Sequence, residues 1–270
     1  TTRLWQSVAS SADGTKLAGY EWRPEGEPSA HVLLIHGQGE HLGRYEYLGE
    51  VLAESGVRTV GVDLRGHGMS QGRRGHIKRW SDYVMDVHAC ADLLPEKFAL
   101  IGHSMGGLIA LSYLTAYAQR VRSLVLSGPL LGVAIAAPAW KTKMAGLLSR
   151  TLPGLSLASG IPLEDLCTDP EAVDLYAQDS LRVSTITPRW FTEMEAAVAQ
   201  VWRSVDSFTT PLSLHVASLE CIVDPAAMDQ LYERWPADKR RWLWKGGKHE
   251  ILQEPFRQGV VAAMLEGIRA

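Results

Sequence analysis

The chain has 270 residues, of which 46% are hydrophobic and 21% charged, and this balance is typical of a globular protein with a sizeable core. A net charge of −3 excludes the strongly basic surface on which nucleic-acid binding depends, so we expect no nucleic-acid partner. No apolar run is long enough to cross a bilayer. Three widely spaced cysteines and an N-terminal stretch without a signal-peptide core predict a cytoplasmic protein with reduced thiols.

Strand and helix patterns alternate through the first half of the chain. Segments 4–8 and 16–22, joined by a turn at 11–15, predict an opening hairpin. Short apolar segments then predict buried strands, and segments with helical spacing predict helices. The expected strands are 31–35, 57–62, 98–101 and 121–127, and the expected helices are 45–54, 80–94 and a run after residue 104. This order is typical of a mostly parallel sheet with helices on both faces.

The alternation stops between residues 130 and 207, where prolines are frequent and strand patterns are missing. Short helical patches occur there, at 139–150, 169–177 and 192–205. Beyond them we expect strands at 212–217 and 241–244 and helices at 226–235 and 255–268. The sequence therefore predicts an α/β core made of residues 1–129 and 208–270. An all-helical cap at 130–207 follows the sixth strand, at the sheet edge where ligands bind in open α/β folds.

A Gly-x-Ser-x-Gly motif at 102–106 carries the strongest chemical signal. An apolar run precedes Gly102 and a helical period follows Gly106, so Ser104 is expected at a sharp turn between a strand and a helix, the position of a nucleophile elbow. A second match surrounds Ser70, but no helical pattern follows it. We therefore predict Ser104 as a nucleophile and Ser70 as a structural loop residue.

A serine nucleophile needs a base to take its proton and an acid to orient that base. In folds with a nucleophile elbow these follow in the chain order serine, acid, histidine. His249 fits this order and lies in a glycine-rich loop just after the last strand, whereas His215 lies inside a strand and is expected to pack in the core. The acid is expected just beyond the strand at 212–217, where Glu220 and Asp224 both qualify by position.

An oxyanion formed during attack on an ester needs two backbone N–H donors. One donor belongs to the residue after the nucleophile, which is Met105. The other is expected in a loop after an early strand, where the glycines on both sides of Gln38 give its backbone freedom to turn inward. No step of this chemistry requires a metal or an organic cofactor, and none is predicted.

Four motifs together resemble the monoacylglycerol lipase and lysophospholipase-like branch of the α/β-hydrolases. They are His36-Gly37-Gln38-Gly39-Glu40-His41 with Gly43-Arg44-Tyr45, Asp63-Leu64-Arg65-Gly66-His67-Gly68-Met69-Ser70, Gly102-His103-Ser104-Met105-Gly106-Gly107, and Lys248-His249-Glu250. The likeness covers essentially the whole chain, including Asp169-Pro170-Glu171 and Tyr176 of the cap. It implies an α/β-hydrolase fold, an oxyanion amide at Gln38, and Glu40 and Arg44 at the polar end of the substrate pocket. The alternative for Arg44 is a surface ion pair with Glu46 or Glu50.

The chain departs from the family pattern at the acid. The family has Gly-x-x-Asp at this point, and Ala217 and Glu220 stand where its glycine and aspartate are expected. Asp224 precedes Pro225, and Asp-Pro is typical of a helix N-cap followed by the first helical residue. We therefore expect Glu220 to be the acid and Asp224 to cap a helix, with Asp224 kept as the alternative acid.

These residues predict a serine hydrolase that cleaves lipid esters, most closely monoacylglycerol. A generalist carboxylesterase, a lysophospholipase and a ligand-binding protein without turnover are the alternatives, and nothing in the sequence predicts an oligomeric state. The helix near 139–152 places Trp140, Met144, Leu147 and Leu148 beside Lys141, Lys143 and Arg150. This pattern is typical of a helix that rests on a membrane surface, and equally of a cap helix that covers a pocket.

Overall fold

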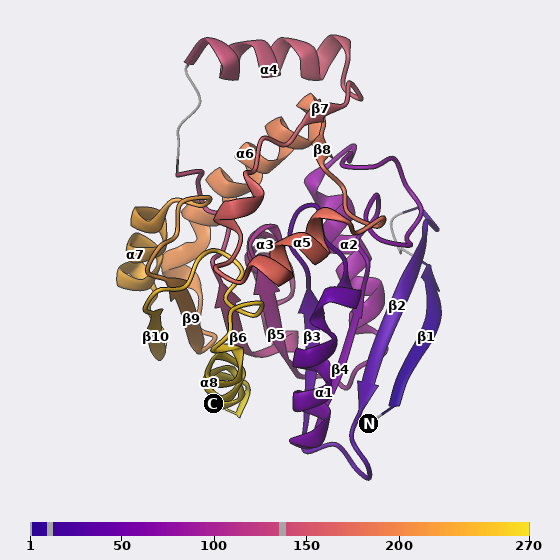
Figure 1. Ribbon diagram of the computed structural model, residues 1–270, viewed down its shortest axis with the longest axis vertical. Coiled ribbons are helices and arrows are strands. Elements are labelled where there is room, and N and C mark those ends of the chain that lie inside the picture. Colours follow the sequence, from indigo (N-terminus) through magenta and orange to yellow (C-terminus); the bar gives the residue numbers. More distant parts are fainter. Residues whose placement is uncertain (1, 10–12, 135–138, 270) are drawn as a thin grey trace.

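The computed structural model describes residues 2–9, 13–134 and 139–269 and contains a central eight-stranded sheet (Figure 1). Its strands are β1 (Thr2–Ala9), β2 (Lys16–Arg23), β3 (Ala30–Ile35), β4 (Val57–Val62), β5 (Phe98–His103), β6 (Val121–Ser127), β9 (Leu212–Ala217) and β10 (Lys239–Trp244). They lie in the order β1-β2-β4-β3-β5-β6-β9-β10. The β1–β2 and β2–β4 pairs are antiparallel and all other neighbours are parallel. The opening hairpin is confirmed, although residues 10–12 of its expected turn lie outside the described residues.

Helices cover both faces of the sheet. They are α1 (Glu46–Glu54), α2 (Trp80–Ala91), α3 (Met105–Tyr117), α7 (Pro225–Arg234) and α8 (Arg257–Arg269), with short 3₁₀ turns η1 (Leu42–Tyr45) and η2 (Ala118–Arg120). Helices α1 and α8 share one apolar cluster, and α2, α3 and α7 share the other. In β3, Leu33 and Ile35 join the α3 side while Val32 and Leu34 join the α1 side, because successive side chains of a strand point to opposite faces. The parallel strands are therefore buried on both sides.

Between β6 and β9, the described residues 130–134 and 139–207 lie beyond one end of the parallel strands (Figure 1). They include α4 (Ala139–Thr151), η3 (Leu163–Asp165), α5 (Pro170–Ala177), α6 (Pro188–Ser204) and η4 (Val205–Ser207). The expectation of helices alone is wrong here, because β7 (Leu157–Ala158) and β8 (Thr185–Ile186) form a small antiparallel sheet. Strands of two residues are too short to leave an alternating pattern in the sequence. None of the helices that the structure describes has the length and apolar character of a membrane span.

The turn between β5 and α3 fixes the position of Ser104. Its φ of 52° and ψ of −119° make it the one non-glycine residue with positive φ among those described. A Cβ atom at Gly102 would meet the carbonyl oxygen of Gly106, and a Cβ at Gly106 would meet that of Ile35. Only glycine fits on either side of the serine, because β3, β5 and α3 approach each other so closely here.

The strain at Ser104 predicts a difference in stability between two inactive variants. Alanine at this position keeps the left-handed backbone under strain, whereas glycine adopts it freely. We expect the free energy of unfolding of Ser104→Gly, measured by urea denaturation, to be about 1 kcal/mol higher than that of Ser104→Ala. Equal or lower stability of the glycine variant would show that the turn is not strained.

Candidate active site

Ser104, His249 and Glu220 come together from three loops that follow β5, β10 and β9. Nδ1 of His249 lies 2.8 Å from Oε2 of Glu220, and both side chains are buried, at 4% and 1% exposure. The second carboxylate oxygen of Glu220 accepts hydrogen bonds from the backbone N–H groups of Ile222 (2.9 Å) and Val223 (3.2 Å). These bonds fix the carboxylate against Nδ1 and leave Nε2 of His249 as the basic nitrogen. Ser104 and His249 line the same cavity.

Glu220 also sets the protonation of His249. Burial alone would lower the pKa of this imidazole, because a buried cation loses its hydration. The charge and hydrogen bond of Glu220 outweigh that cost, so the pKa of His249 lies above its ordinary value. The same pairing holds the pKa of the Glu220 carboxyl below its ordinary value, although burial alone would raise it. A carboxylate beside a readily protonated imidazole is the arrangement that general-base catalysis requires.

Asp224 lies elsewhere, at the N-terminus of α7. Its carboxylate accepts the backbone N–H of Ala226 at 2.9 Å, and Pro225 occupies the first helical position. The structure therefore places Asp224 as a helix cap and places Glu220 against His249.

The loop after β3 lies directly beside Ser104. A Cβ atom at Gly37 would be 3.1 Å from Cβ of Ser104, so the backbone that carries Gln38 is in contact with the serine. His36 holds this loop, because its Nδ1 donates to the carbonyl of Gly37 (2.8 Å) and its Nε2 accepts from the N–H of Leu64 (2.9 Å). Burial lowers the pKa of His36 to about 4, so the ring stays neutral and keeps both roles at neutral pH.

Met105 supplies the other amide expected beside the serine. It is the first residue of α3 and is fully buried. The first N–H groups of a helix have no acceptor within the helix and carry its positive dipole end. The two backbone segments expected to carry oxyanion donors, the Gln38 loop and the start of α3, therefore both adjoin Ser104.

Two cavities of opposite character meet at Ser104, and both are lined by Gln38 and Ser104. The larger has about 1050 Å³ of empty space, part of it open to solvent. Its apolar lining includes Leu130, Ile161, Trp190, Phe191, Met194 and Ile222. The smaller has about 460 Å³ of empty space, part of it also open to solvent, and its lining mixes apolar side chains with polar and charged ones, among them Glu40, His103, Tyr176, Arg182, His249 and Glu250. A molecule that reaches across Ser104 therefore meets a mainly apolar lining on one side and most of the charged side chains on the other.

Arg44 lies behind the polar cavity rather than at the protein surface. Its guanidinium binds both carboxylate oxygens of Glu250, at 3.1 and 2.6 Å, and lies 3.9 Å from a carboxylate oxygen of Glu40. It also lies 4.0 Å from the centroid of the Tyr176 ring. Burial alone would lower the pKa of Arg44, but the two carboxylates raise it above its ordinary value, so Arg44 stays charged. Glu40 lines the polar cavity, and Arg44 contacts three of the side chains that line it, those of Glu40, Tyr176 and Glu250.

The two residues expected to be structural have contacts that fit that role. Ser70 is buried, donates to the carbonyl oxygen of Asp63 and accepts the N–H of Ala18 at 2.9 Å. His215 is fully buried in β9 and stacks on Trp242 and Trp244. In the part of the chain that the structure describes, no group of three or more His, Cys, Asp or Glu side chains is placed to hold a metal ion.

The sequence analysis missed several residues of the polar cavity. Glu250 and His103 adjoin predicted catalytic residues, so their neighbourhood could have been inferred, but not the direction of their side chains. Arg182 lies in a loop of the 130–207 segment with no motif around it, and no sequence signal marks it.

The 130–207 segment is hydrogen-bonded to each catalytic loop. The Val183 N–H donates to the carbonyl of Gly39 (2.9 Å) beside Gln38, and the Glu250 N–H donates to the carbonyl of Leu166 (2.7 Å) beside His249. Next to the Glu220 loop, the Asp224 N–H donates to the carbonyl of Gly132 (3.0 Å).

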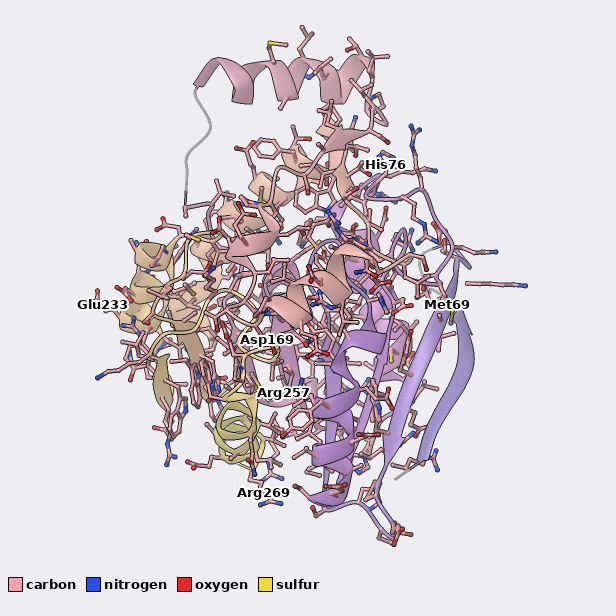
Figure 2. The ribbon with its side chains drawn as sticks, in the orientation of Figure 1. Met69, His76, Asp169, Glu233, Arg257 and Arg269 are labelled. Carbon is pink, nitrogen blue, oxygen red and sulfur yellow. The ribbon has the colours of Figure 1, made fainter. Side chains whose placement is uncertain are left out.

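A further contact ties this segment to the loop before α2. Nδ1 of His76, labelled in Figure 2, lies 2.9 Å from Oγ1 of Thr187. Helix α4 stands apart from these contacts, at the outer end of the molecule (Figure 1).

Comparison with known proteins places the chain among hydrolases. The family model for serine aminopeptidase, S33 matches residues 26–256. Phospholipase YtpA of Bacillus subtilis is 30% identical over 90% of this chain and 96% of its own length. Human monoglyceride lipase is 31% identical over 90% of this chain and 83% of its own length. An abhydrolase domain-containing protein of Dictyostelium discoideum is 31% identical over 96% of this chain, which spans only 28% of that larger protein.

Solved structures agree with these relatives. Monoacylglycerol lipase of Paleococcus ferrophilus superposes with a TM-score of 0.87 at 29% identity, covering 93% of this chain and 97% of that one. A monoglyceride lipase variant of Saccharomyces cerevisiae, 22% identical, shares the fold with a TM-score of 0.85 over 98% of this chain and 94% of that one. The expected α/β-hydrolase fold and the resemblance to monoacylglycerol lipases are confirmed. The chain therefore belongs to the serine aminopeptidase, S33 family, as an α/β-hydrolase and serine ester hydrolase similar to monoglyceride lipases.

Proposed function

We propose that the protein hydrolyses esters of a long acyl chain with a small polar alcohol, and that monoacylglycerol is the best match. The observation that carries this proposal is the meeting of an apolar and a polar cavity at Ser104. The larger apolar cavity suits the hydrocarbon chain, and the smaller polar cavity suits glycerol. Names of relatives that refer to monoacylglycerol or monoglyceride support the same substrate class. Glu40 borders the glycerol, and Arg44 holds Glu250 and Tyr176 in place around it.

In the proposed mechanism, Nε2 of His249 removes the proton from the Ser104 hydroxyl while Oγ of Ser104 attacks the ester carbonyl carbon. The N–H groups of Gln38 and Met105 bind the oxyanion that forms. Protonated His249, stabilised by Glu220, then gives its proton to the leaving alcohol as the ester bond breaks. Water, activated by His249 in the same way, releases the fatty acid from Ser104.

We also propose that residues 130–207 form a cap on a core made of 1–129 and 208–270, and that α4 carries the cap onto a lipid surface. Met144 and Leu147 of α4 are 49% and 62% exposed and line neither cavity, so they do not cover the pocket. Arg150 beside them is also exposed. The side chains of Trp140, Lys141 and Lys143 lie outside the described residues. An apolar face with a basic neighbour supports contact with an anionic membrane.

Labelling and turnover together test the nucleophile. A fluorophosphonate should label the wild-type protein and Ser70→Ala but not Ser104→Ala, with the labelled residue identified by mass spectrometry. Turnover of monoacylglycerol should fall at least about 10⁴-fold in Ser104→Ala, because the remaining oxyanion hole supplies no nucleophile. Ser70→Ala serves as the control and should keep most of its turnover once its folded fraction is taken into account. Loss of labelling in a folded Ser70→Ala protein would transfer the role to Ser70.

The pH dependence of turnover tests the acid. Turnover needs neutral His249, so kcat/KM should fall as the pH drops through the raised pKa of this imidazole, above its ordinary value of 6.5. Glu220→Gln removes the charge that raises this pKa, so the acidic limb should move to lower pH and kcat should fall at least about a hundredfold. Asp224→Asn can still cap α7, and it should leave the position of the limb unchanged. If the acidic limb of the kcat/KM profile stays in place in Glu220→Gln and moves in Asp224→Asn, Asp224 is the acid.

Binding to vesicles tests the role of α4. Replacing Met144 and Leu147 by serine removes apolar area from its exposed face, so affinity for phosphatidylglycerol–phosphatidylcholine vesicles should fall at least about fivefold. The double variant Leu93→Ser, Leu243→Ser, on exposed leucines outside the cap, is the matched control and should bind like the wild type. Sedimentation with vesicles measures both. Equal binding by all three proteins would exclude α4 as the membrane contact.

A further inference from the structure

The loop before α2, residues 72–79, gathers positive charge on a chain whose net charge is −3. Four cations of this loop are exposed: Arg73, Arg74, Lys78 and Arg79. Gly75 and Ile77, which stand between them, are buried. The two buried residues anchor the loop, so its exposed cations are carried by a fixed backbone.

Neighbouring carboxylates do not neutralise this loop. Asp82 lies 4.0 Å from the guanidinium of Arg79, and Glu193 lies 4.0 Å from Arg189 of α6. Once these two acids are assigned to those two cations, the other three cations of the loop have no ionic partner among the described residues. The loop therefore carries surplus positive charge.

An exposed apolar part of the 130–207 segment lies directly against the loop. A Cβ atom at Gly154 would collide with the guanidinium of Arg73, so this arginine rests on the chain that leaves α4. Three leucines around this glycine are exposed: Leu152, Leu155 and Leu157. None of the three lines either cavity. Positive charge and exposed hydrocarbon are therefore neighbours on one surface.

Further contacts hold the loop and this apolar part together. A Cβ atom at Gly75 would collide with the carbonyl oxygen of Thr185 in β8, and β8 pairs with β7, which contains Leu157. Nδ1 of His76, labelled in Figure 2, lies 2.9 Å from Oγ1 of Thr187 just after β8. The loop of the core and the 130–207 segment thus present a single surface.

The titration of His76 reflects the same cations. The pKa of His76 lies below its ordinary value because of its burial and then because of the positive charges of Arg73, Arg189 and Lys78. Together these outweigh the opposite effect of Asp82. Cations from the loop and from α6 therefore act on one point, and the surplus charge is concentrated there.

This surface reaches the margin of the active site. Ser159 and Ile161, which follow Leu157 in the chain, line both cavities. Both cavities are partly open to solvent. A lipid layer in contact with Leu157 would therefore lie beside the lining of the space that leads to Ser104.

We infer that residues 73–79 and 152–157 form a docking surface for a bilayer that contains anionic lipid. The exposed leucines enter the acyl region while the cations of the loop bind lipid phosphates, a combination suited to peripheral binding. This inference rests on the proposed function, since it names the kind of membrane from which the lipid ester is taken. It adds to α4 a second contact, made partly by the core, that selects negative lipid and turns both cavities toward the bilayer.

Double variants separate charge from packing. Arg73→Gln, Lys78→Gln removes two charges, so affinity for phosphatidylglycerol–phosphatidylcholine vesicles, measured by sedimentation at low salt, should fall at least about fivefold. Affinity for pure phosphatidylcholine vesicles should stay the same. Arg73→Lys, Lys78→Arg keeps both charges and should bind like the wild type. Lys97→Gln, Arg122→Gln makes the same change in net charge at the starts of β5 and β6, the ends opposite Ser104, and should also bind like the wild type.

A further pair of variants tests the hydrocarbon part of the surface. Leu155→Ser, Leu157→Ser should weaken binding to the phosphatidylglycerol-containing vesicles at least about fivefold, because less apolar area enters the lipid. Leu93→Ser, Leu243→Ser is again the matched control. If only the charge variant loses binding, the surface suits a soluble polyanion or an acidic protein, and the inference is overturned.

Turnover gives a third readout. The charge variant should cleave p-nitrophenyl butyrate in solution at the wild-type rate, because Arg73 and Lys78 line neither cavity. It should cleave monoacylglycerol presented in phosphatidylglycerol-containing vesicles more slowly than the wild type. Wild-type affinity of this variant for those vesicles would overturn the inference. Failure of the proposed function looks different, because the wild-type protein would then cleave neither ester, whatever its affinity for vesicles.

Discussion

The close approach of β3, β5 and α3 around Ser104 is the constraint on which the rest of the site depends. Gly102 and Gly106 allow three backbones to meet where any side chain would collide with a carbonyl oxygen. This contact places Ser104 at the end of β5 in a strained conformation and fixes the start of α3 directly after it. His249, Glu220 and the Gln38 loop can act together only if they are correctly placed relative to the serine that this turn positions.

The buried carboxylates around Ser104 are paired with other groups of the protein. Glu220 is tied to its own backbone and to His249, and Glu250 is tied to Arg44, so the buried acids each have a fixed partner. A buried charge without a partner would be costly, and pairing removes that cost while leaving one nitrogen of His249 available. Among the described side chains that line the larger cavity, only Asp165 carries a charge. The other charged side chains beside Ser104 therefore line the smaller cavity.

Much of the fold was predictable because local sequence patterns indicate its strands and helices. The alternation of strand and helix patterns predicted the sheet. The order of the motifs predicted Ser104 as the nucleophile and His249 as the base. The distinction between Glu220 and Asp224 rested on Asp-Pro, a local cap signal, and the structure places both side chains accordingly. Arg182 and the short strands β7 and β8 were missed because their positions depend on long-range contacts. The partner of Arg44 was missed for the same reason, since Glu250 is distant in sequence.

The hydrogen bonds from the 130–207 segment to the catalytic loops have a mechanical consequence. They join backbone atoms at Gly39, Leu166 and Gly132, so a displacement of this segment would move the backbone of the loops as well. The part of this segment that lies nearest the site is thus coupled to the catalytic loops through the main chain. Helix α4 makes none of these three bonds and is joined to α6 instead, through Ser149 and Thr192. A displacement of α4 would therefore be passed on through α6, which packs against α3 and so against the helix that starts at the serine.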